Sequence, residues 1–210
     1  AINDLNVTTE TEGWTRSAPG CDLFNNSSAN FAEALSLAEE ADYVVLTLGI
    51  ETCGMTRSHN INPGAPGKCF HGHSTSEYVF PDQYMELESH DRTTIDLPPV
   101  QRQFAGEVLA LGKPTVLVLF NGGAVAIGPD IISRSGDTSS DEDGARRKAA
   151  GASGSAAPMA IIEAFYPGPR GGEALAQGIF GWHNRWGRLP YTIYPAKFVE
   201  EAKDMAEHDL

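Results

Sequence analysis

The sequence predicts an α/β fold, a doubly wound and mostly parallel sheet flanked by helices in a three-layer α/β/α sandwich. Two short apolar runs, Tyr43–Leu48 and Thr115–Phe120, have the β-branched content of strands buried on both faces, as in parallel sheets. A helical pattern precedes each run, and a third strand followed by a helix comes later. We expect the 210 residues to form a single domain, 1–210, interrupted by two long loop insertions.

The first helix is expected from about Phe31 to Ala41, with Asn30 as its cap. Its apolar positions recur at helical spacing, at Phe31, Leu35, Leu37 and Ala38. The strand Tyr43–Leu48 follows directly and stops at Gly49. Residues 52–85 then lack a sustained period and are rich in glycine and proline, so they are predicted to form the first insertion, a long loop.

A second helix is expected to open at Pro98 and Pro99 and to stop at Gly112, because proline suits a first turn and glycine a helix end. Its apolar face consists of Val100, Phe104, Val108, Leu109 and Leu111. The strand Thr115–Phe120 follows and ends in the turn Asn121–Gly123.

Residues 133–157 contain only Ser, Thr, Gly, Ala and charged residues, which cannot bury apolar area. They are therefore predicted to form the second insertion, a low-complexity and solvated segment. The chain then continues with a third strand at Ala160–Phe165 and a helix from Gly172 to about Phe180. A last strand-like stretch is predicted at Gly187–Tyr194.

Charge and hydropathy exclude some classes of partner. The chain has 28 acidic and 15 basic residues, a formal charge of -13, which argues against nucleic acid or an anionic membrane as the main partner. No apolar run approaches the roughly 20 residues that a membrane span needs. Sequons at Asn6, Asn25 and Asn26 favour a secreted or lysosomal/vacuolar protein, and the absence of a starting Met favours a processed piece of a longer chain.

The segment Glu86–Arg92 concentrates carboxylates beside an arginine. Glu86, Glu88 and Asp91 repel one another, which favours holding one of them protonated, and Arg92 can orient a neighbouring carboxylate. A protonated carboxyl is what a general acid needs. From local chemistry alone, a solvated acidic loop with an incidental Asp–Arg pair is the alternative interpretation.

Two further groups of residues permit more than one interpretation. The first insertion carries two cysteines and three histidines, but their spacing lacks the close cysteine pair of common zinc sites. We therefore expect a disulfide or free thiols, and no metal site, from Cys53, Cys69, His59, His71 and His73. Similarly, Trp182, His183 and Trp186 can stack on sugar rings, yet packing is the favoured interpretation.

The order of motifs resembles the second domain of glycoside hydrolase family 3, in its β-xylosidase/β-glucosidase branch. The matching pieces run in the same order along roughly residues 18–195: Ala18–Cys21, Ala41–Ile50, Glu86–Arg92, Ile95–Pro98, Val100–Gln101, Pro114–Leu119, Asn121–Gly123, Tyr166–Gly168, Gly171–Ala176 and Gly187–Thr192.

This resemblance implies a retaining glycosidase in which a (β/α)8 barrel, in the parent chain or a partner, provides the sugar pocket and nucleophile. It makes Glu88 the acid/base candidate, with Glu86 as runner-up, while Asp91 and Arg92 would order their loop. The implied substrates are oligosaccharides or glycosides with terminal β-linked glucose or xylose, and no metal or organic cofactor is implied. This chain alone would be inactive. The alternative is a non-catalytic carbohydrate-binding or structural module derived from the family.

Overall fold

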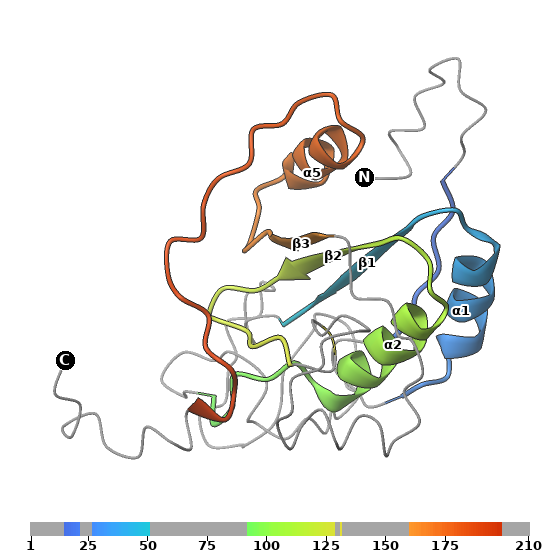
Figure 1. Cartoon of the computed structure of the whole chain (residues 1–210), viewed down its shortest axis with the longest axis horizontal. Coiled ribbons are helices and arrows are strands. Elements are labelled where there is room, and N and C mark those ends of the chain that lie inside the picture. The colour runs from blue at the N-terminus through green and yellow to red at the C-terminus, as the bar shows by residue number, and fades with distance from the viewer. Residues whose placement is uncertain (1–14, 22–26, 51–91, 129–130, 132–159, 199–210) are drawn as a thin grey trace, which may run out of the picture.

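The computed structural model describes residues 15–21, 27–50, 92–128, 131 and 160–198 (Figure 1). Its elements follow in the order α1 (Phe31–Glu40), β1 (Val44–Gly49), α2 (Pro99–Ala110), β2 (Thr115–Phe120), β3 (Ala160–Glu163) and α5 (Gly171–Ile179). This alternation confirms the expected α/β class. The two predicted insertions, residues 52–85 and 133–157, lie outside the described residues.

The described strands form one parallel sheet in the order β1-β2-β3. β1 pairs with β2 from Val44 opposite Thr115 to Gly49 opposite Phe120. β2 pairs with β3 up to Leu119, which lies opposite Glu163. Parallel strands bring their carboxyl ends to the same edge of a sheet, and this edge is the usual place for ligands in open α/β folds.

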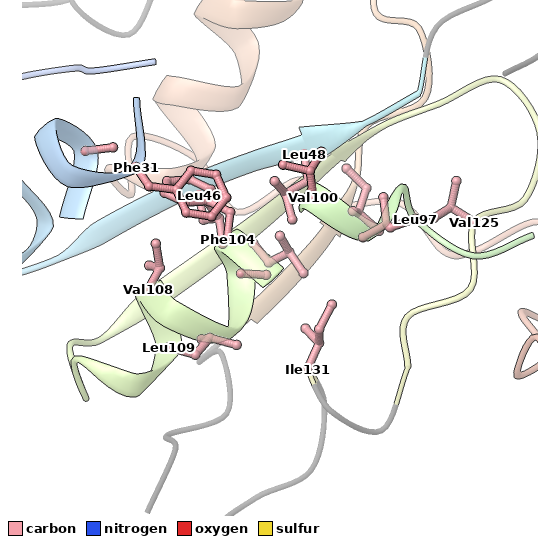
Figure 2. Close-up of a cluster of buried hydrophobic side chains, with 14 of the residues drawn as sticks. Phe31, Leu46, Leu48, Leu97, Val100, Phe104, Val108, Leu109, Val125 and Ile131 are labelled. Carbon is pink, nitrogen blue, oxygen red and sulfur yellow. The ribbon is translucent and has the colours of Figure 1, made fainter. Parts of the chain in front are cut away.

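One face of the sheet packs against α1 and α2 and forms the core (Figure 2). Phe31 of α1 meets Phe104 of α2 with ring centroids 4.8 Å apart. Burying each large apolar side chain contributes about 1.5–3 kcal/mol. The core residues that the sheet and α2 supply are Leu46, Leu48, Leu117, Leu119, Val100, Phe104, Ala105, Val108 and Leu109.

Burial of the first helix and first strand differs from expectation. α1 buries Phe31, Ala34 and Ala38, because this spacing of three and four residues faces α2, whereas Leu35 and Leu37 are only partly buried. β1 is buried on one face only, since Thr47 on the other face is exposed. The predicted burial on both faces describes β2 better, where Leu117, Val118 and Leu119 are all buried.

The C-terminal part of the described chain is more exposed than the part that forms the core. In Figure 1, α1 and α2 lie on one side of the strands and α5 stands on the other, while the complete three-layer sandwich stays a prediction. The expected strand at Gly187–Tyr194 is wrong: these residues form no strand, and most are exposed. No described helix is long and apolar enough to span a bilayer.

Candidate functional site

The predicted catalytic carboxylates belong to the segment between Ile50 and Arg92. The chain enters and leaves this segment at the carboxyl edge of the sheet. β1 ends at Gly49, and Ile50 is the last described residue before residue 92. β2 and β3 end beside it, at Phe120 and Glu163. Glu86, Glu88 and Asp91 lie outside the described residues, so their positions stay predictions.

The end of β1 is held by a buried side chain of α2. The Gln101 side chain is 1% exposed, and its carboxamide bonds both backbone groups of Gly49. The Gly49 N–H donates to Gln101 Oε1 at 2.9 Å, and Gln101 Nε2 donates to the Gly49 carbonyl at 2.7 Å. On the other side of the strand, the Ile50 N–H donates to the Phe120 carbonyl at 2.9 Å. The chain therefore leaves the sheet from a fixed point.

Glycine is required at position 49 for steric reasons. Its φ is 154°, and a Cβ there would overlap the backbone carbonyl of Phe120. The Tyr166 hydroxyl, from the segment after β3, adds a hydrogen bond to the Ile50 carbonyl at 3.3 Å. The end of β2 and the segment after β3 therefore both hold the chain where it leaves β1.

The chain returns to the same edge at Arg92, the predicted loop-ordering residue. Arg92 Nη2 donates to the Ala124 carbonyl at 2.7 Å. Just downstream, the Ala126 N–H donates to the Ile95 carbonyl at 2.6 Å, and a parallel bridge joins Asp96 to Ala126. The end of β2 thus holds the departing chain, and the segment that follows β2 holds the returning chain.

Two more residues lie at this edge: Asn121, which the sequence placed in a turn, and Glu163, to which it assigned no role. Asn121 is fully buried, and its Nδ2 donates to the Gly123 carbonyl at 2.9 Å, which closes the turn after β2. Both carboxyl oxygens of Glu163 are buried. Burial raises the pKa of this carboxyl, and the nearby Asn121 side chain and Phe165 backbone offset only part of the rise. The sequence did contain a sign that Glu163 is unusual, because it is an acidic residue within the otherwise apolar predicted strand Ala160–Phe165.

Of the two tryptophans near α5, Trp186 packs against the helix, as expected, whereas Trp182 does not show such packing in the contacts of the described residues. The Trp186 indole lies against α5 where Gly178 leaves room for it, although 48% of the residue remains exposed. Trp182 is 51% exposed. His183 Nε2 lies 2.7 Å from Gln177 Oε1, so this imidazole is engaged with α5.

The metal and disulfide expectations for the first insertion concern residues outside the described part of the chain: Cys53, His59, Cys69, His71 and His73. Among the described residues, no group of three or more His, Cys, Asp or Glu could hold a metal ion. Cys21 is partly buried and packs against the core.

Comparison with known proteins gives consistent similarities. Residues 4–137 match the model of the glycosyl hydrolase family 3 C-terminal domain. The chain is 33% identical over 181 residues to probable beta-D-xylosidase 7 of Arabidopsis thaliana, covering 86% of this chain and 17% of that protein. It is 32% identical over 182 residues to the probable exo-1,4-beta-xylosidase bxlB of Aspergillus flavus, covering 87% and 17% respectively.

A solved structure is also similar. It is a GH3 exo-beta-xylosidase, XlnD, in complex with a xylobiose aziridine activity-based probe. The TM-score is 0.50 at 27% identity, over 87% of this chain and 17% of that one. The chain therefore spans about 17% of the length of each of these relatives.

Proposed function

The chain belongs to glycosyl hydrolase family 3, and we propose that the protein containing it removes terminal β-linked xylose from oligosaccharides or other glycosides. The observation that carries the proposal is the agreement between the family match and the named relatives, which are β-xylosidases. Glucose, the other sugar that the motifs allow, is the alternative specificity. The named relatives favour xylose.

In this proposal Glu88 is the acid/base residue, with Glu86 as runner-up. Glu88 protonates the leaving oxygen and then takes a proton from the water that attacks the covalent glycosyl intermediate. Support comes from Arg92, four residues later, whose guanidinium is fixed to the Ala124 carbonyl at the carboxyl edge. Asp91, next to that anchor, has the same loop-ordering role as Arg92.

The nucleophile and most of the sugar pocket belong to a (β/α)8 barrel outside this chain, in the same parent protein or in a partner. In a retaining mechanism the two carboxyls must lie about 5 Å apart, so Glu88 acts only where this domain packs against the barrel. The complete domain is then a three-layer sandwich presenting its carboxyl edge to the barrel, and the isolated chain has no glycosidase activity. We also propose a secreted or lysosomal/vacuolar location, to be tested by glycosidase digestion of the native protein at its sequons.

The test uses the full-length natural protein and three variants, Glu88→Gln, Glu88→Ala and Glu86→Gln. We expect Glu88→Gln to abolish turnover of xylobiose but to retain cleavage of an aryl xyloside with a good leaving group, because that leaving group needs no protonation. Glu86→Gln is the matched control and should keep most activity.

Azide gives an independent readout. In Glu88→Ala, azide can attack the glycosyl intermediate without a general base and should release β-xylosyl azide. If Glu86→Gln instead shows the leaving-group dependence, the runner-up is the acid/base residue. If the wild-type protein cleaves neither xylosides nor glucosides, the non-catalytic module replaces the hydrolase.

A further inference from the structure

A small groove opens beside α5. Its described lining includes Gly171 and Leu175 of the helix, Pro167 before it, and Arg185 and Trp186 of the segment that follows it. In Figure 1 this segment turns back along α5 before it leaves the helix. The groove has a volume of about 230 Å³, below the roughly 300 Å³ at which pockets for drug-sized ligands begin, so it suits a single sugar ring and not a long chain.

The indole of Trp186 is held in place at this groove while much of it stays open to solvent. A Cβ at Gly178 would lie 2.6 Å from Cζ2 and 2.7 Å from Cη2 of the indole, so only glycine lets the ring lie this close to α5. The residue is nonetheless 48% exposed. A fixed aromatic side chain loses little conformational freedom when a ligand packs on it, and the C–H groups of a pyranose ring pack well on an indole.

Arg185 supplies a positive charge to the same groove. Arg170, just before α5, is held by Glu173 through two hydrogen bonds of 2.9 and 3.1 Å. Arg185, by contrast, is exposed and makes no hydrogen bond or ion pair with the described residues. No acidic residue occurs between Glu173 and Glu200, although the chain contains 28 of them. The groove is therefore locally cationic in an otherwise acidic chain.

We propose that this groove binds the uronic acid residue of an acidic xylo-oligosaccharide, with the pyranose ring on Trp186 and the carboxylate on Arg185. The planar guanidinium offers a carboxylate two parallel N–H donors, whereas a neutral sugar gives it only hydroxyl groups to bond. Because both side chains line one groove of single-ring size, one uronic acid can contact both. The xylose chain of this ligand rests on the proposed function, whereas the uronic acid site does not.

Binding of two matched monosaccharides to the full-length natural protein, measured by isothermal titration calorimetry, tests the site. Methyl α-D-glucuronide and methyl α-D-glucoside differ only in the carboxylate at C6, and as α-glycosides neither is a substrate for a β-glycosidase. We expect the glucuronide to bind about tenfold more tightly, because hydrogen bonds to charged groups contribute more than neutral ones. Added salt should reduce this difference, since the groove is open to solvent.

Two variants and two matched controls locate the binding. Arg185→Gln should reduce the affinity for the glucuronide to that for the glucoside, and Trp186→Ala should weaken both sugars about tenfold. Arg188→Gln makes the same change of charge, and Trp182→Ala removes a similarly exposed indole, at positions outside the described lining of the groove. Both controls should leave the two affinities within about twofold of wild type.

The proposal is overturned if neither sugar binds, which is the result expected where the rest of the parent protein covers this face, or if the two sugars bind equally. It is also overturned if Arg188→Gln has the same effect as Arg185→Gln, because binding then follows net charge alone. If Trp186→Ala does not fold, judged by circular dichroism, the comparison of Arg185→Gln with Arg188→Gln decides.

The xylose chain is tested by retention on insoluble acidic xylan and on the same xylan after chemical reduction of its carboxyl groups. The acidic form should retain the wild type more strongly, and both forms should retain Arg185→Gln equally. Equal retention of the wild type on the two forms refutes an acidic xylo-oligosaccharide as the ligand. If the wild type binds the glucuronide but cleaves no xyloside, the proposed function fails and the uronic acid site stands.

Discussion

Replacing Gln101 by Leu would remove the side chain that holds the end of β1. Leucine fills a similar volume but offers neither donor nor acceptor, so the Gly49 N–H and carbonyl both lose their partners. A buried polar group left without a partner costs about 1–3 kcal/mol, which gives roughly 2–6 kcal/mol for the pair. We take about 3 kcal/mol as the expected loss, because local relaxation lets water reach part of this edge.

Hydrogen–deuterium exchange of the natural protein, followed in peptides from β1 and β2, measures this loss locally. A destabilisation of about 3 kcal/mol corresponds to roughly a hundredfold loss of amide protection where opening governs exchange. The matched control is Gln103→Leu on the same helix, since Gln103 is exposed and its side chain donates to Glu107 Oε1 at 2.9 Å. The control should change stability by less than about 0.5 kcal/mol.

The reasoning is refuted if Gln101→Leu and Gln103→Leu lose protection equally. It is also refuted if the loss in Gln101→Leu is confined to α2 and leaves the amides of β1 and β2 protected. In the first case the two hydrogen bonds contribute no net stability. In the second case Gln101 stabilises its own helix and not the strand end.

Further predictions follow from the same edge and from the core. Gly49→Ala should lower the thermal midpoint strongly, because its Cβ would overlap the Phe120 carbonyl, and an unchanged melting curve would contradict the close approach. Arg92→Lys should keep folding, judged by circular dichroism, but lower turnover of xylobiose, because a lysine cannot reproduce the planar guanidinium contact to Ala124; full activity would refute this. Leu117→Ala should cost about 2–5 kcal/mol in urea unfolding, whereas Thr47→Ala on the exposed face of β1 should cost far less, and similar costs would argue against a one-sided core.

The sequence pattern predicted the central elements well because their physical signals are local. The run Thr115–Phe120 is β-branched and continuous, and it forms β2 with the same bounds. Pro99 and Gly112 mark a helix by their backbone preferences alone, and α2 begins at Pro99. Burial is less local. Tyr43 is 74% exposed although it begins an apolar run, because no described element covers that end of β1.

The stretch Gly187–Tyr194 also shows that a local pattern does not determine the contacts a segment makes. Its alternating pattern needs a neighbouring strand to become a strand, and no described strand pairs with it. The candidate site was predictable only where it depended on residue type. Arg92 stood out by its charged neighbours, whereas Gln101 acts through Gly49, a residue 52 positions earlier that the packing of α2 against the sheet brings next to it.

The contact between Gln101 and Gly49 also limits how the sheet can grow. Within the described residues, β1 has a neighbouring strand on one side only. The Gly49 N–H and carbonyl point towards the open side, since the next N–H, that of Ile50, bonds β2. The Gln101 carboxamide takes both positions that a further strand would use there. Any strand that extends the sheet beyond β1, from the same protein or another copy, must therefore stop short of Gly49, which protects this end of the edge from unwanted strand pairing.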